Sequence, residues 1–204
     1  MKKLATIFGI LALFTACQMA DDAPVIVENK ATAVDLTAEL PELSIYNLPS
    51  TWTTQDGEDI ELQELRGKVL VMVMVYTSCK AACPRLVADM RNIEKQLPEK
   101  DLDKVQFIMV SIDPATDTPE RLKEFSKENL MEDEHWMFLR GTEEATREFA
   151  TVLAVSYKKI SPIDFSHSNI ISVFDENGVL VHQREGLGVD NTETVAAIHT
   201  EVSN

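Results

Sequence analysis

Val69-Leu-Val-Met-Val-Met-Val-Tyr76 runs directly into Thr77-Ser-Cys79-Lys-Ala-Ala-Cys83-Pro84, and this stretch decides the fold. The part before Tyr76 contains no polar or charged residue, so a strand formed here is apolar on both faces. Such a strand belongs in the centre of a sheet that helices cover on either side. The stretch therefore predicts an α/β layer architecture with two cysteines at the end of a central strand.

The rest of the chain continues this alternation of helical and extended patterns. Apolar residues recur at helical spacing after Pro84, residues 105–112 form a second buried-strand pattern, and Asp117-Thr118-Pro119-Glu120 has the composition of a helix start. We also expect short strands at 45–48, 52–54 and 136–139 and a helical turn that ends at Gly67. A helix is expected after Gly141-Thr142, with Ala145, Phe149, Val152 and Leu153 on one face. Residues 170–174 and 179–182 are expected to form a hairpin, and Val195, Ile198 and Val202 to lie on a last helix. This order predicts a thioredoxin-like fold, in which helices flank a central mixed sheet and short strands form an N-terminal extension.

The N-terminus has the pattern of a bacterial lipoprotein signal. Lys2 and Lys3 precede an apolar stretch, and Thr15-Ala16-Cys17 places small residues before a cysteine. The apolar stretch is shorter than the ~18–20 residues that span a bilayer, which argues against a transmembrane anchor; an ordinary cleavage site is the other alternative. We expect a signal peptide at 1–16, lipidation of Cys17, an acidic flexible tether at 17–40 and a domain at 41–204, exported and held at the extracytoplasmic face of a membrane.

Charge and cysteine usage narrow the function further. The formal net charge of −15 disfavours nucleic acid and anionic membranes as partners, and either attracts basic or cationic partners or simply maintains solubility. Once Cys17 carries lipid, only Cys79 and Cys83 remain, which excludes a disulfide scaffold. If their segment is helical, the two sulfurs lie on consecutive turns of one face. In an oxidising compartment this pair is then either redox-active or bound to a metal.

Four ordered blocks resemble the SCO/SenC family, copper-handling proteins linked to cytochrome c oxidase assembly. They are Tyr76-Thr-Ser-Cys79-Lys-Ala-Ala-Cys83-Pro84, Ser111-Ile-Asp113-Pro114-Ala-Thr-Asp117-Thr118-Pro119-Glu120, Trp136-Met-Phe-Leu139-Arg-Gly141, and His167-Ser168 before a strand and an Asp-x-x-Gly hairpin. The resemblance covers about residues 43–202. Many members carry an acidic residue between the cysteines and an Asp before the histidine, whereas this chain has Lys80-Ala81-Ala82 and Ser166 there.

The resemblance implies a copper site whose ligands are Cys79, Cys83 and His167. Thiolates suit soft copper(I), and imidazole suits both copper oxidation states. The helix start near Pro84 and the charge of Lys80 are expected to favour the thiolates. We expect Asp113 and Asp117 to serve in a loop and a helix cap rather than as ligands, and Asp164 is a weak candidate for an extra ligand.

The implied function is delivery of copper, or of electrons to cysteines, at the CuA site of cytochrome c oxidase. The expected partner is the CuA subunit or another copper or thiol protein, and the chain is not expected to be an enzyme with turnover. The alternative is an exported thiol–disulfide oxidoreductase, in which Cys79 attacks a partner disulfide and the redox-active Cys83 resolves the intermediate. A peroxidase is a weaker third interpretation.

Overall fold

The computed structural model describes residues 38–80 and 82–203. The expected signal peptide, the lipidation site Cys17 and nearly all of the expected tether lie outside this part of the chain. Within it, no helix is both long enough and apolar enough to cross a membrane.

A seven-stranded mixed sheet forms the centre of the described domain. Its strands run in the order β2-β1-β5-β4-β3-β8-β9. The three neighbours β3, β4 and β5 are parallel, while β8 is antiparallel to β3 and β1 is antiparallel to β5. The strands are β1 (Thr51–Thr54), β2 (Asp59–Glu61), β3 (Val69–Val75), β4 (Val105–Ser111), β5 (Trp136–Arg140), β8 (Ile170–Phe174) and β9 (Leu180–Glu185). The expected thioredoxin-like α/β architecture is confirmed.

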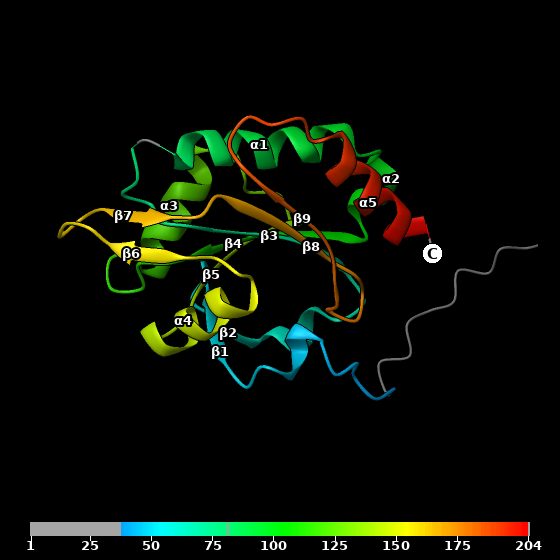
Figure 1. The fold of residues 1–204 in the computed structure, drawn as a ribbon, viewed down its shortest axis with the longest axis horizontal. Helices are drawn as coiled ribbons and strands as arrows, with labels where there is room; N and C mark the ends of the chain where they lie inside the picture. The colour runs from blue at the N-terminus through cyan, green and yellow to red at the C-terminus, as the bar shows by residue number, and fades with distance from the viewer. Residues whose placement is uncertain (1–37, 81, 204) are drawn as a thin grey trace, which may run out of the picture. The chain divides into compact units, whose positions relative to one another are not determined.

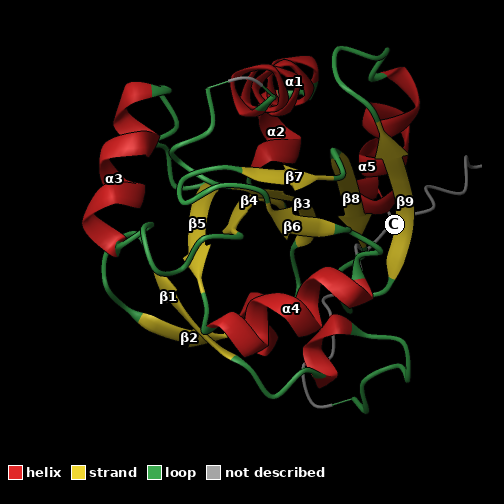
Figure 2. Ribbon diagram, turned by 60° about the vertical axis from the view of Figure 1, so that its left-hand side comes forward, coloured by secondary structure: helices red, strands yellow, loops and turns green. Residues whose placement is uncertain are grey.

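Helices cover both faces of this sheet (Figures 1 and 2). The helix α1 (Cys83–Gln96) lies on the same face as α5 (Thr192–Ser203), and α4 (Glu143–Val152) lies on the opposite face. A short helix α2 (Glu99–Leu102) follows α1, and α3 (Pro119–Glu128) packs Phe125 against Phe138 of β5. Because both faces are covered, every residue of β3 and of β4 is buried.

Local signals set the helix starts as the sequence predicts. The hydroxyls of Thr118 and Thr142 accept hydrogen bonds from the first turns of α3 and α4, and Pro84 occupies the first turn of α1. The cap of α3 is thus Thr118 rather than Asp117. At the end of α4, Leu153 is buried but Val152 is exposed, so the prediction that Val152 faces the core is wrong.

The expected strand at residues 45–48 is also wrong. This segment forms the 3₁₀ helix η1 (Ile45–Asn47), because the Ser44 hydroxyl accepts the backbone N–H of Tyr46 and starts a turn. Ile45 and Tyr46 are still buried, so their apolar side chains indicate that they pack in the core and not that the backbone is extended. The second 3₁₀ helix, η2 (Leu62–Leu65), supplies the helical turn expected before Gly67.

The parallel strands place the chemically important loops at one edge of the sheet. The loop after β3 carries the cysteines, and the loop after β4 carries Asp113 and Asp117; the carboxyl ends of parallel strands meet at the same edge. A separate two-stranded hairpin, β6 (Tyr157–Lys159) with β7 (Phe165–His167), projects beyond this edge beside the start of α1 (Figure 1). The hairpin was not predicted from the sequence, although it carries His167.

Candidate metal centre

The two cysteines lie where the central strand passes into the first helix. Helix α1 begins at Cys83, so Cys79 precedes it in the loop; the segment between the cysteines is not helical, and the two sulfurs do not lie on consecutive helical turns. The backbone N–H of Cys83 nevertheless donates to the Sγ of Cys79 over 3.3 Å, which keeps the two residues adjacent. No disulfide joins the two described cysteines; Cys79 is partly exposed and Cys83 is buried.

The β6–β7 hairpin brings His167 to the buried cysteine. The Nε2 atom of His167 lies 3.8 Å from the Sγ of Cys83. On the other side of the ring, Nδ1 lies 2.9 Å from the backbone carbonyl oxygen of Ser168, to which Nδ1–H donates. That bond leaves the Nε2 lone pair of the neutral ring directed at the sulfur, which is the orientation a metal ligand requires.

The spacing of these two atoms fits a shared ion. With zinc as a yardstick, a metal–thiolate bond of about 2.3 Å and a metal–imidazole bond of about 2.0 Å, set at about 120°, separate the ligand atoms by about 3.7 Å. Among the described residues, the ligand atoms of Cys79, Cys83 and His167 do not all lie within 4.8 Å of one another. Cys83 and His167 are therefore spaced as two ligands of one ion could be, and a third bond from the Cys79 sulfur would require that sulfur to come closer.

Burial controls the protonation of this pair. It raises the pKa of the Cys83 thiol well above its usual value, and the neighbouring Cys79 sulfur raises that pKa further. The expectation that the helix start and Lys80 make Cys83 a ready thiolate is therefore wrong, because desolvation outweighs them. The helix N-terminus instead directs the Cys83 N–H at the Cys79 sulfur. Burial also lowers the pKa of His167, so its imidazole is neutral and able to ligate near pH 7.

Tyr76, the first residue after β3, anchors the hairpin over the cysteines. Its hydroxyl lies 3.1 Å from Oδ1 of Asp164 and 3.3 Å from the carbonyl oxygen of Phe165, and it accepts the Phe165 N–H over 3.3 Å. Its ring packs against the rings of Phe165 and His167, with centroids 5.2 and 5.8 Å away. Asp164 of the hairpin thus has a structural partner in the Tyr76 hydroxyl, and Tyr76 couples the position of His167 to the end of the central strand.

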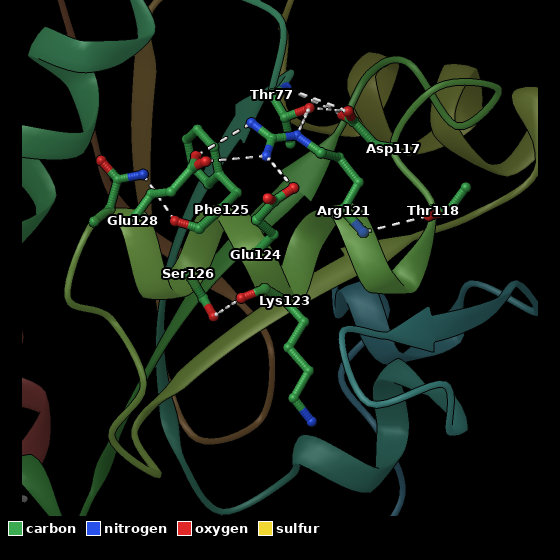
Figure 3. A network of polar contacts seen from close by, with 10 residues as sticks. Thr77, Asp117, Thr118, Arg121, Lys123, Glu124, Phe125, Ser126 and Glu128 are labelled. Carbon is green, nitrogen blue, oxygen red and sulfur yellow. Dashed lines mark hydrogen bonds and ion pairs between the residues drawn. The ribbon is translucent and has the colours of Figure 1, made fainter.

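A buried carboxylate holds the base of the cysteine loop (Figure 3). Asp117 accepts the Thr77 hydroxyl over 2.6 Å, the Thr77 backbone N–H over 3.2 Å and the Ser111 hydroxyl over 2.6 Å. Arg121 donates its Nε–H to the Thr77 hydroxyl and forms ion pairs with Glu124 and Glu128. Burial raises the pKa of Asp117, and its position confirms the expected loop role.

The sequence interpretation missed the roles of Tyr76 and Thr77. Both residues lie within the cysteine block, but neither is a typical metal ligand, so ligand chemistry alone does not identify them. An aromatic residue with a hydroxyl at the end of an otherwise apolar strand is the signal that identifies Tyr76, because a buried hydroxyl needs a polar partner. The partner of Thr77 is 40 residues away in sequence, and no local pattern indicates it.

The other three described histidines have structural partners elsewhere. His135 pairs with Glu94, His182 with the Thr194 hydroxyl and His199 with Asp101. Met72 and Met74 are fully buried in β3, so packing rather than copper ligation explains them.

Comparison with known proteins places this geometry in a family. The SCO1/SenC family model matches residues 42–203. A SCO1 protein homolog of Bacillus subtilis is 34% identical over 103 residues, which cover 50% of this chain and 53% of that relative, so the chain spans about half of its length. Among solved structures, a SCO1/SenC family lipoprotein of Bacillus anthracis superposes with a TM-score of 0.68 at 27% identity, covering 74% of this chain and 91% of that one. The copper-bound ScoI of Bradyrhizobium japonicum gives a TM-score of 0.60 at 26% identity, covering 76% and 98%. The chain therefore belongs to the SCO1/SenC family.

Proposed function

We propose that this chain is an exported, lipid-anchored copper carrier that supplies the CuA site of cytochrome c oxidase, with Cys79, Cys83 and His167 as the copper ligands. The observation that carries the proposal is the 3.8 Å approach of His167 Nε2 to the Cys83 sulfur, with the ring fixed by the Ser168 carbonyl. In the free protein the protonated Cys83 thiol can donate to this nitrogen, and copper would take the place of that proton.

The donor set suits copper in both oxidation states. Two thiolates favour soft copper(I), and the imidazole adds a ligand that copper(II) also accepts. Because Cys83 is protonated in the free protein, taking up copper must release its proton. The Cys79 sulfur is the more exposed of the two, so copper enters and leaves on its side.

The relatives support the choice of metal and of anchor. A copper-bound solved structure lies among the family members that this chain resembles, and another is described as a lipoprotein. The pattern Thr15-Ala16-Cys17 supports the same anchor here, at the extracytoplasmic face of the membrane. The link to the oxidase comes from the family resemblance.

An anaerobic copper titration of the reduced chain tests the proposal. We expect one copper(I) per chain, with loss of tight binding in Cys79→Ser and in Cys83→Ser. In His167→Ala we expect copper(I) to be kept on the two thiolates while copper(II) binding is largely lost. Full copper affinity in either cysteine variant contradicts the two-thiolate site.

The asymmetry of the two thiols favours thiol–disulfide exchange as a second candidate function. Cys79 is partly exposed and Cys83 is buried behind it, the arrangement of an attacking and a resolving cysteine. In this reaction the Cys79 thiolate attacks a partner disulfide and releases one partner thiol. Cys83 then loses its proton and attacks Cys79, which releases the second partner thiol and leaves a Cys79–Cys83 disulfide.

His167 separates the two functions, because dithiol exchange does not need an imidazole ligand. An oxidoreductase keeps most of its rate of disulfide reduction in His167→Ala, whereas a copper carrier loses oxidase assembly in that variant. If His167→Ala supports normal oxidase assembly while Cys79→Ser does not, the exchange function replaces the copper carrier.

A further inference from the structure

Three side chains that can bind a metal ion meet away from the cysteines, where the end of α1 approaches the start of β5. Glu94 lies in the last turn of α1, and Asp133 and His135 lie in the loop just before β5. The ligand atoms of all three residues lie within 4.8 Å of one another. In residues 38–80 and 82–203, no other set of histidine, cysteine and carboxylate side chains meets this condition.

An ordered turn sets Asp133 and His135 beside each other. The Trp136 backbone N–H donates to the Asp133 carbonyl oxygen over 2.9 Å, which closes residues 133–136. The Phe107 N–H of β4 donates to the His135 carbonyl oxygen over 2.8 Å, and the two rings lie 6.1 Å apart, edge to face. The loop is thus tied to the sheet, which fixes the backbone that carries both side chains.

A buried tryptophan orients the third side chain, Glu94. The Nε1–H of Trp136 donates to Oε1 of Glu94 over 2.8 Å, and the Trp136 ring stacks on Phe107 with centroids 4.8 Å apart. The same Oε1 lies 2.6 Å from Nε2 of His135. A hydrogen bond from a group that is not itself a ligand typically orients a metal-binding carboxylate. Trp136 is placed to support Glu94 in this way.

The cluster carries more negative charge than its own histidine can neutralise. Neither Glu94 nor Asp133 forms an ion pair with a described lysine or arginine, and Glu132 and Glu134 flank Asp133. An ion pair between His135 and Glu94 accounts for one carboxylate and leaves that of Asp133 without a cation. A divalent cation balances both carboxylates.

We propose that Glu94, Asp133 and His135 form a second metal site, which binds a zinc-type divalent cation and clamps the end of α1 to the start of β5. One imidazole and two carboxylates suit zinc, and water takes the fourth position of the tetrahedron. Zinc bonds of about 2.0 Å at tetrahedral angles place ligand atoms about 3.3 Å apart. When zinc enters, the proton between His135 and Glu94 leaves, and their 2.6 Å contact widens by about 0.7 Å.

This inference does not rest on the proposed copper function, because the second site contains no cysteine. Its metal therefore stays bound when Cys79 and Cys83 form a disulfide or are replaced. Copper(II) generally binds nitrogen and oxygen ligands more tightly than zinc does, so it competes for this site. Copper(II) measurements on the Cys79–Cys83–His167 site are accordingly made with His135→Gln in every chain, so that His135 adds no imidazole signal.

The test uses the full chain with Cys79→Ser and Cys83→Ser, here called the double-serine chain, in neutral detergent micelles. Zinc alone is the probe. Calorimetry gives the stoichiometry and affinity, X-ray absorption at the zinc edge gives the ligand types, and tryptophan fluorescence follows the surroundings of Trp136.

Three site variants and one control are each added to the double-serine chain. The site variants are Glu94→Gln, Asp133→Asn and His135→Gln. The matched control is His199→Gln, because His199 also pairs with a carboxylate, that of Asp101, but has no third ligand within the same distance in the described part of the chain.

We expect the double-serine chain to bind one zinc ion through imidazole and oxygen ligands without sulfur. Each site variant weakens zinc binding at least tenfold, and His199→Gln leaves the affinity unchanged. Zinc also changes the fluorescence of Trp136, because Trp136 is bonded to Glu94, and His135→Gln abolishes this change.

Absence of zinc binding by the double-serine chain overturns the inference and leaves His135 and Glu94 as an ion pair. Full affinity in Asp133→Asn or His135→Gln also overturns it, because the zinc is then adventitious on an acidic surface. The Asp133 side chain is exposed, so loss of binding in Asp133→Asn is not a folding defect. Failure of the reduced wild type to bind copper refutes the proposed function instead and leaves the zinc test unaffected.

Discussion

Tyr76→Phe tests whether the Tyr76 hydroxyl holds the β6–β7 hairpin, which carries His167, over the cysteines. The change keeps the ring, which packs on Phe165 and His167, and removes an accepted hydrogen bond from the Phe165 N–H and a donated one to Asp164 or the Phe165 carbonyl. Each hydrogen bond contributes about 1 kcal/mol net, so the hairpin loses about 2 kcal/mol of anchoring free energy. That amount corresponds to about a 30-fold rise in the open population.

Hydrogen exchange of residues 157–167 measures this opening directly. We expect protection of the hairpin amides to fall about 30-fold in Tyr76→Phe, while the sheet amides of β3 and β4 change little. Copper(II) affinity falls by less, because it depends on the fraction of hairpin that remains closed. Tyr46→Phe is the matched control: the Tyr46 hydroxyl is buried with no hydrogen-bond partner among the described residues. Equal hairpin exchange in both variants refutes the anchoring role of Tyr76.

Two further predictions follow from the same geometry, and a third follows from the sequence of the N-terminus. Copper(I) affinity falls at least tenfold for each pH unit below neutrality in a competition titration, because burial raises the pKa of Cys83 and its proton must leave for ligation; a pH-independent affinity contradicts this. Burial also raises the pKa of Asp117, so its contribution to stability is present below the ordinary value and is lost as pH rises through the raised one. Urea unfolding should therefore show the wild type gaining stability over Asp117→Asn between pH 7 and pH 4, and a constant difference argues against a buried, titrating carboxylate. Cys17→Ala abolishes lipid labelling and releases the chain from membranes with copper binding intact; continued membrane attachment contradicts the proposed lipid anchor.

The sequence was sufficient for the central part of the fold because burial there is uniform. Seven successive apolar residues in β3 and the mostly apolar β4, which contains Gln106 and Ser111, indicate a parallel pair covered on both faces. Helix starts at Thr118 and Thr142 were readable for a similar reason, since a side chain that caps a helix acts on its own neighbours.

Long-range contacts explain what the sequence could not supply. The hairpin strands have three residues each, too short for a clear alternating pattern, and their placement depends on a hydroxyl 88 residues earlier. The expectation that Cys83 is a ready thiolate was wrong for the same reason. The sequence shows the helix start beside Cys83, but it does not show that the assembled fold buries the Cys83 thiol. In the 45–48 segment the apolar residues correctly predicted burial. They wrongly suggested a strand, because the backbone forms a 3₁₀ helix.

X-ray absorption at the copper edge tests the ligand set most directly. The wild-type chain loaded with one copper(II) should show two sulfur ligands and at least one imidazole nitrogen, and His167→Ala should lose the imidazole signal. His199→Ala, which removes a half-exposed histidine paired with Asp101, should leave the spectrum unchanged. An imidazole signal that persists in His167→Ala, or a site without two sulfur ligands in the wild type, contradicts the assignment of Cys79, Cys83 and His167.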